Sequence, residues 1–152
     1  VEGKEAMLNL ADWTAMKPQY LDSALDEKWS ARLALRSDVM KALENARAAK
    51  IIGHPLDADV TIYAEGDAYE TLKAMGDFLS DFFIVSNVEL VNDTSAAPAD
   101  ALTNEDGVRV SVAPSTRQKC ERCWKHLDSV GSNPNHPDVC ARCARVLDEE
   151  KE

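Results

Sequence analysis

Apolar residues in the first third of the chain recur at the three- and four-residue spacing of an amphipathic α-helix. Two adjacent stripes hold Trp29, Leu33, Met40 and Leu43, and then Leu35, Val39, Ala42 and Ala46. The pattern predicts a long helix over residues 23–50, with Asp26 and Glu27 near its N-terminal dipole and Gly53 and Pro55 ending it. One helix cannot enclose a core, so its wide apolar face must pack on the rest of the chain, on a helical bundle outside it, or on a second copy.

After this helix the spacing switches between two-residue alternation and helical periodicity. It predicts a strand at 56–63, a helix at 67–82, a second strand at 84–91 and a third at 107–112. Segment 92–106 is rich in Ala, Asp, Ser and Thr, and we expect a flexible loop there. The predicted fold class is α+β: a long helix, a small β-α-β-β unit and a C-terminal zinc ribbon, which the cysteines described below suggest.

The chain divides into three expected segments. Residues 1–53 would be the end of a helical region, 54–114 a small α+β junction domain, and 115–152 the cysteine module with an acidic tail. Residues 1–20 show little periodicity and indicate an extended lead-in. The chain begins at Val1 without an initiator Met, so we expect a processed chain or, more so, a piece cut from a longer protein. No basic and apolar leader indicates a secretory signal. It holds no run of 18 apolar residues, so we expect no membrane contact.

All four cysteines of the 152 residues lie close together, as Cys120-Glu121-Arg122-Cys123 and Cys140-Ala141-Arg142-Cys143. Two such pairs separated by 16 residues have the spacing of a four-thiolate zinc site. Each pair can hold one side of a metal, and four protein ligands leave no position for water, so the predicted Zn²⁺ is structural. Cysteine pairs without other cysteines also fit a reducing compartment, and we expect a cytoplasmic protein.

Two alternatives to a four-cysteine zinc site are a redox-active cysteine pair and a metal site with a histidine ligand. A redox-active Cys-x-x-Cys is disfavoured because two pairs occur at ribbon spacing without a thioredoxin-like strand before them. A histidine could also replace one cysteine, since His126 and His136 lie close in the sequence.

Charge is distributed unevenly along the chain, whose net charge is −10. Residues 51–116 hold twelve acids and two bases, whereas residues 117–147 hold six bases and three acids. The tail 148–152 is acidic again. The cysteine module is therefore a basic island on an acidic protein. The net negative charge of the chain argues against DNA as a partner. The local positive charge of the cysteine module is nevertheless compatible with RNA binding. A charge mixture that merely keeps the protein in solution is the alternative.

Candidate RNA-binding residues gather at the first cysteine pair. Arg122, Trp124, Lys125 and His126 combine cations with an aromatic ring, which suits a splayed loop base because Arg meets phosphate while Trp stacks on a base. The alternative is that Trp124 covers a small core. Arg36 and Arg47 on the long helix are weaker candidates for contacting an RNA backbone, since Glu44 and Arg47 have the spacing of an ordinary helix ion pair.

The cysteine module resembles a known family more specifically than its spacing does. Lys119-Cys120-Glu121-Arg122-Cys123-Trp124, followed by His136-Pro137-Asp138-Val139-Cys140-Ala141-Arg142-Cys143, resembles the C-terminal zinc motif of bacterial isoleucyl-tRNA synthetases. A second block is similar to the last helix of that family's anticodon-binding region and the step after it: Trp29, Leu35-Arg36, Val39, Lys41-Ala42-Leu43-Glu44, Arg47, Lys50, Ile52-Gly53, Leu56, Ala58, Ile84-Val85-Ser86 and Val88. The resemblance spans about residues 25–91 and 107–147.

The resemblance implies a C-terminal piece of a class I aminoacyl-tRNA synthetase. The full enzyme of that family uses ATP to charge tRNA with isoleucine and hydrolyses misacylated valine, and none of this catalysis is expected within these 152 residues. Ile52-Gly53-His54 resembles part of the ATP-binding motif of that family. Because it follows a predicted helix, we interpret it as the cap that ends this helix. The implied partners are the anticodon arm of tRNA(Ile) and the upstream part of the synthetase. The competing hypotheses are a free-standing zinc-ribbon adaptor and a DNA-binding finger of the glycosylase type.

Overall fold

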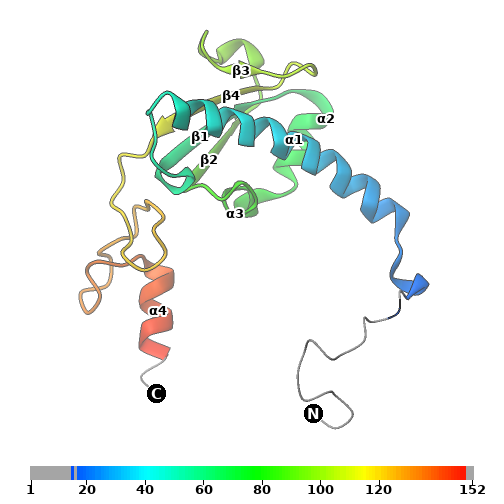
Figure 1. The fold of residues 1–152 in the computed structure, drawn as a ribbon. Helices are drawn as coiled ribbons and strands as arrows, with labels where there is room; N and C mark the ends of the chain where they lie inside the picture. The colour runs from blue at the N-terminus through cyan, green and yellow to red at the C-terminus, as the bar shows by residue number, and fades with distance from the viewer. Residues whose placement is uncertain (1–14, 16, 150–152) are drawn as a thin grey trace.

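A four-stranded mixed sheet is at the centre of the molecule (Figure 1). The computed structural model describes residue 15 and residues 17–149. The strands are β1 (Ala58–Tyr63), β2 (Asn87–Val91), β3 (Leu102–Thr103) and β4 (Arg109–Pro114). Their order is β2-β1-β4-β3, with β2 parallel to β1 and the other two pairings antiparallel. The lead-in predicted for residues 1–20 lies mostly outside the described residues, and the described Pro18–Tyr20 forms a 3-10 turn.

Helix α1 (Ser23–Ala48) confirms the long helix predicted from the sequence. The side chain of Asp22 caps its start by accepting a hydrogen bond from the amide of Leu25 at 3.0 Å. Its end differs from the prediction, because Lys50 takes the left-handed conformation with φ 59°. The amide of Ile51 then donates to the carbonyl of Ala46 at 2.9 Å, which closes a Schellman motif before Gly53 is reached.

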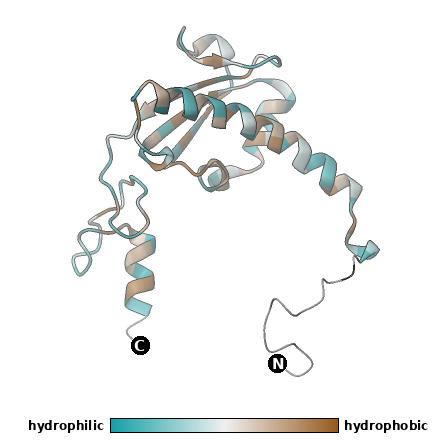
Figure 2. Ribbon diagram, in the orientation of Figure 1, coloured by the Kyte–Doolittle hydropathy of each residue, from teal (hydrophilic) through white to brown (hydrophobic). Residues whose placement is uncertain are grey.

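The second half of α1 packs on the sheet, mainly against β4, and buries Val39, Ala42, Leu43 and Ala46. Its first half extends beyond the sheet (Figure 1), and hydrophilic and hydrophobic residues alternate along it (Figure 2). Leu25 and Leu33 are about half exposed there. The apolar face predicted from the sequence is therefore covered by the sheet over one half of the helix.

The crossover between β1 and β2 contains two short helices where the sequence predicted one. Helix α2 (Gly66–Lys73) and helix α3 (Leu79–Phe83) are separated by a 3-10 turn at Gly76, whose φ is +51°. The separation lets both helices cover the sheet. Phe83 is completely buried beneath them, and its ring lies 5.1 Å from that of Phe82.

The prediction of a three-stranded β-α-β-β unit is not confirmed, because the segment expected to be a flexible loop contributes the short strand β3. That segment also contains a 3-10 turn at Thr94–Ala96. The guanidinium of Arg109 donates to the carbonyl oxygen of Pro98 at 2.8 Å and so ties the segment to β4. A two-residue strand lacks the alternation that would reveal it in a sequence. The mobility of residues 92–106 and the three domain boundaries stay predictions.

No helix within residues 17–149 is both long enough and apolar enough to cross a membrane.

Candidate metal centre

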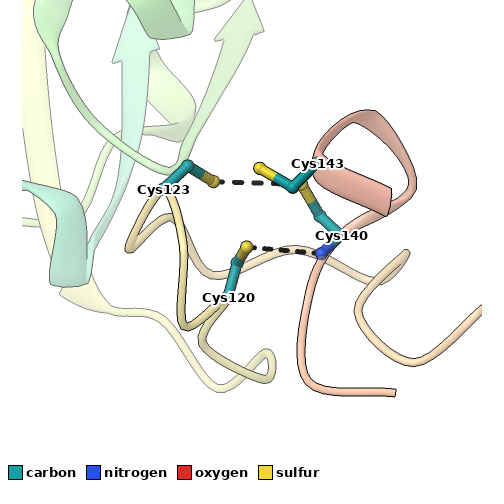
Figure 3. Close-up of side chains that lie close together, drawn as sticks. All are labelled: Cys120, Cys123, Cys140 and Cys143. Carbon is teal, nitrogen blue, oxygen red and sulfur yellow. Dashed lines mark hydrogen bonds between the residues drawn. The ribbon is translucent and has the colours of Figure 1, made fainter. Parts of the chain in front are cut away.

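The two cysteine pairs converge on one point (Figure 3). The sulfur atoms of Cys120, Cys123, Cys140 and Cys143 all lie within 4.8 Å of one another, and the four thiols form no disulfide. The Sγ atoms of Cys123 and Cys140 are 3.8 Å apart. Tetrahedral zinc with Zn–S bonds of about 2.3 Å requires a sulfur–sulfur separation of about 3.8 Å. The cluster therefore has the dimensions of a four-thiolate zinc site.

The first cysteine pair sits on a tight chain reversal. The amide of Cys120 donates to the carbonyl of Lys125 at 2.9 Å, and the amide of Trp124 donates to the carbonyl of Cys120 at 2.8 Å. Trp124 takes the left-handed conformation, with φ 66°, to close this reversal. A large side chain in this conformation costs about 1–2 kcal/mol, so the turn holds Trp124 against its local preference.

The second pair begins helix α4 (Ala141–Glu149), so that Cys140 precedes the helix and Cys143 lies in its first turn. The amide of Cys140 donates to Sγ of Cys120 at 3.3 Å and links the two pairs. We call residues 117–149 the finger. Its small core consists of the cysteines with Val130, Val139 and Ala144. This arrangement fits a zinc ribbon whose second pair is carried by a helix.

The surroundings of three of the thiols shift their pKa values in different directions. Burial by itself would raise the pKa of Cys120, but the amides of Cys123, Cys140 and Arg122 stabilise its thiolate and lower that pKa to about 6. Burial raises the pKa of Cys123 to about 12, and it also raises the pKa of Cys140. Cys120 is therefore the thiol most ready to bind a cation as a thiolate, and Cys123 and Cys140 must release their protons to solvent when they bind it.

Lys125 and His126, predicted as RNA contacts, both have partners within the protein, and their contact with RNA stays a prediction. The ammonium of Lys125 lies 2.5 Å from Oδ1 of Asp81, and its side chain is 18% exposed. His126 makes a hydrogen bond through its ring with the carbonyl of Arg117 at 2.8 Å. His136 likewise contacts Oδ1 of Asp148 at 2.9 Å. Both histidines are thus engaged outside the sulfur cluster.

Trp124 and Arg122 lie exposed at the tip of the first reversal. Trp124 is 58% exposed, and Nζ of Lys119 lies 5.9 Å from the centre of its ring. Sequence reasoning missed Lys119 as a neighbour of this ring. The structure brings Lys119 to this reversal by pairing it with His126 as an isolated β-bridge. An exposed aromatic ring beside a cation is suited to stacking on a nucleic-acid base.

The two helix arginines are placed separately from this tip, on α1. Nε of Arg36 donates to the carbonyl of Phe82 at 3.0 Å, which ties α1 to α3. Arg47 pairs with Glu44 at 2.6 Å, and this confirms the ion pair suggested by their spacing. Contact of either arginine with RNA stays a prediction.

Comparison with known proteins shows that the finger is similar to a family of zinc fingers. Residues 117–146 match the family described as a zinc finger found in FPG and IleRS. This match and the four clustered cysteines support one structural zinc ion.

The resemblance then extends over nearly the whole chain. Over 94% of its own length, the chain is 42% identical to the isoleucine–tRNA ligase of Caldanaerobacter subterraneus subsp. tengcongensis. Over 93% of its own length, it is 42% identical to the isoleucine–tRNA ligase of Moorella thermoacetica. The corresponding enzyme of Syntrophomonas wolfei is 45% identical over 96% of the chain. The chain spans 15–16% of the length of these relatives. It is a homologue of a segment of the isoleucine–tRNA ligases, which confirms the family inferred from the motifs.

Proposed function

We propose that this chain is the C-terminal tRNA-recognition part of an isoleucine–tRNA ligase. Its role is to seat the anticodon arm of tRNA(Ile) so that the distant acceptor end reaches the catalytic site. The observation that carries this proposal is the exposed Trp124, held in an unfavourable backbone conformation at the tip of the finger. Strain and lost apolar burial at one residue point to a role in binding.

The cysteines would hold the metal, and the neighbouring side chains would meet RNA. Cys120, Cys123, Cys140 and Cys143 are the proposed ligands, and zinc would supply the cross-link that fixes the two cysteine pairs. Trp124 offers an aromatic face to an unstacked base, while Arg122 and Lys119 supply positive charge for the adjoining phosphates. Catalysis, including the use of ATP, would belong to the part of the ligase outside these 152 residues.

The remaining elements have a supporting role in this proposal. Helix α1 would close a helical anticodon-binding region, with Arg36 and Arg47 as lesser candidates for backbone contact. The sheet would act as the junction that carries the finger. We further propose a cytoplasmic location and an upstream synthetase region as the other partner, because both follow from the function of the relatives.

Replacement of Trp124 tests this function. In the full-length ligase, Trp124→Ala should raise the KM for tRNA about 5- to 150-fold, since base stacking contributes about 1–3 kcal/mol. Isoleucine-dependent ATP–pyrophosphate exchange should not change. Tyr20→Ala is the control, because Tyr20 is another exposed aromatic residue and lies in the 3-10 turn before α1. An unchanged KM for tRNA, or equal loss in both assays, would refute the proposal.

The finger alone would also suit a DNA glycosylase, since its family description includes FPG. Binding of duplex DNA by this acidic chain is disfavoured by its net charge of −10 and by its similarity to the ligases outside the finger.

A further inference from the structure

The finger and the rest of the protein have separate apolar cores. Within the described residues, one core gathers around the sheet, and the other around the cysteines. We call the first body, residues 23–114, the α/β unit. Figure 1 shows the finger beyond the end of β4, beside this unit. Because the two cores do not merge, the direction of the finger must be fixed by the polar contacts between the two bodies.

Arg117 makes the first of these contacts. One of its terminal nitrogens lies 2.7 Å from Oδ2 of Asp59 on β1, and its Nε lies 2.9 Å from Oδ2 of Asp128 in the finger. The side chains of Arg117 and Asp59 are both less than a third exposed. One planar guanidinium therefore joins a central strand to the finger in a fixed geometry.

Ser86 provides the second contact and is almost completely buried, at 3% exposure. Its hydroxyl donates to the carbonyl of Leu56 at 2.5 Å and accepts from the amide of His126 at 2.6 Å. The ring of His126 donates from Nδ1 to the carbonyl of Arg117, and its Nε2 lies 3.5 Å from Oδ1 of Asp57. The loss of the Ser86 hydroxyl would leave a buried amide and a carbonyl without their partner.

Lys125 provides the third contact, through α3. Its ammonium approaches Asp81 at 2.5 Å and the hydroxyl of Ser80 at 3.2 Å. The acceptors for Arg117, His126 and Lys125 thus come from three separate segments of the α/β unit. Two of the six bases of the finger, Arg117 and Lys125, thus pair with acids of the acidic unit.

We propose that Ser86, Arg117, Lys125 and His126 form an interdomain latch that sets the direction of the finger. Lys125 and His126 are then positioning residues for tRNA, and they act by aiming Trp124 instead of touching RNA themselves. The aiming of Trp124 toward RNA rests on the function proposed above, whereas the fixed orientation of the finger does not.

A charge exchange between Lys125 and Asp81 separates positioning from contact. Amide residual dipolar couplings of the zinc-loaded chain should fit one alignment tensor for β1, β4 and α4 in the wild type. Lys125→Asp, Asp81→Lys and Ser86→Ala should each require two tensors, with the zinc content unchanged. The couplings of the Lys125→Asp/Asp81→Lys double variant should again fit a single alignment tensor. Lys73→Asp is the control, since Lys73 is an exposed lysine on α2. A single common tensor in all of the single variants would overturn the latch.

The same variants in the full-length ligase test the consequence for tRNA. Each single variant should raise the KM for tRNA by about tenfold or more, because misaligned binding groups lose their contacts. The double variant should restore the KM. If it restores the tensor but leaves the KM high, Lys125 touches RNA and the positioning role is wrong. If Trp124→Ala has no effect on KM while the tensors behave as expected, the function proposed for the finger fails and the latch stands.

Discussion

Removal of zinc should unfold the finger and leave the α/β unit folded. The aliphatic side chains buried in the finger core are chiefly Val130 and Val139, and each contributes about 1.5–3 kcal/mol by burial. Structural zinc contributes about 10–16 kcal/mol to small zinc-finger domains, which is more than both valines together. The sheet, by contrast, has its own core with Ile62 and Phe83 fully buried, and nothing in it depends on the cysteines.

Amide hydrogen exchange measures this outcome for the two bodies separately. After chelation under reducing conditions, amides of residues 117–149 should exchange at nearly unprotected rates, while those of β1 keep their protection. Cys143→Ser should give the same pattern without a chelator, and Ser132→Ala serves as the matched surface control. Protected finger amides after complete removal of metal would refute the argument, and so would loss of protection in β1 at the same zinc concentration.

Two further predictions concern protons and the end of α1. Zinc binding at pH 7 should release protons, because zinc binds thiolates, whereas thiols with the ordinary pKa of about 8.5 are mostly protonated in the unfolded, metal-free finger. Zinc affinity should therefore increase as pH rises through the neutral range; calorimetry in buffers of different ionisation enthalpy counts the protons, and a count of zero contradicts this. Lys50→Gly should raise the free energy of unfolding by about 0.5–1 kcal/mol in denaturant titration, since glycine relieves the left-handed strain there. Ala49→Gly, at a right-handed position, should lower it, and equal effects would be inconsistent with this reasoning.

The sequence predicted those features that depend on local spacing. The two cysteine pairs predicted the sulfur cluster, and the apolar stripes of α1 predicted its start at Ser23. Its end was misplaced because Lys50, a residue with no special preference for left-handed backbone, replaces the expected glycine. The single helix expected at 67–82 was divided for a related reason, since one Gly inside a helical pattern does not by itself indicate a break.

The roles of charged residues were the least accessible from sequence. Lys125 and Trp124 are adjacent, yet one packs against α3 and the other is exposed. Their difference is decided by Asp81 and Ser86, which are about 40 residues away in the chain and carry no pattern that links them to the cysteines. Long-range polar contacts of this kind depend on how two folded bodies meet, and local spacing contains no information about that.

The position of β4 has a consequence for the synthesis of the chain. β4 ends at Pro114, so in synthesis from the N-terminus all four strands of the sheet are made before Arg117 and the cysteines. Every acceptor from the α/β unit for Arg117, Lys125 and His126 then already exists when the cysteines emerge. The finger is thus the later of the two bodies to be made, and it meets acceptors of the α/β unit that are already in the chain.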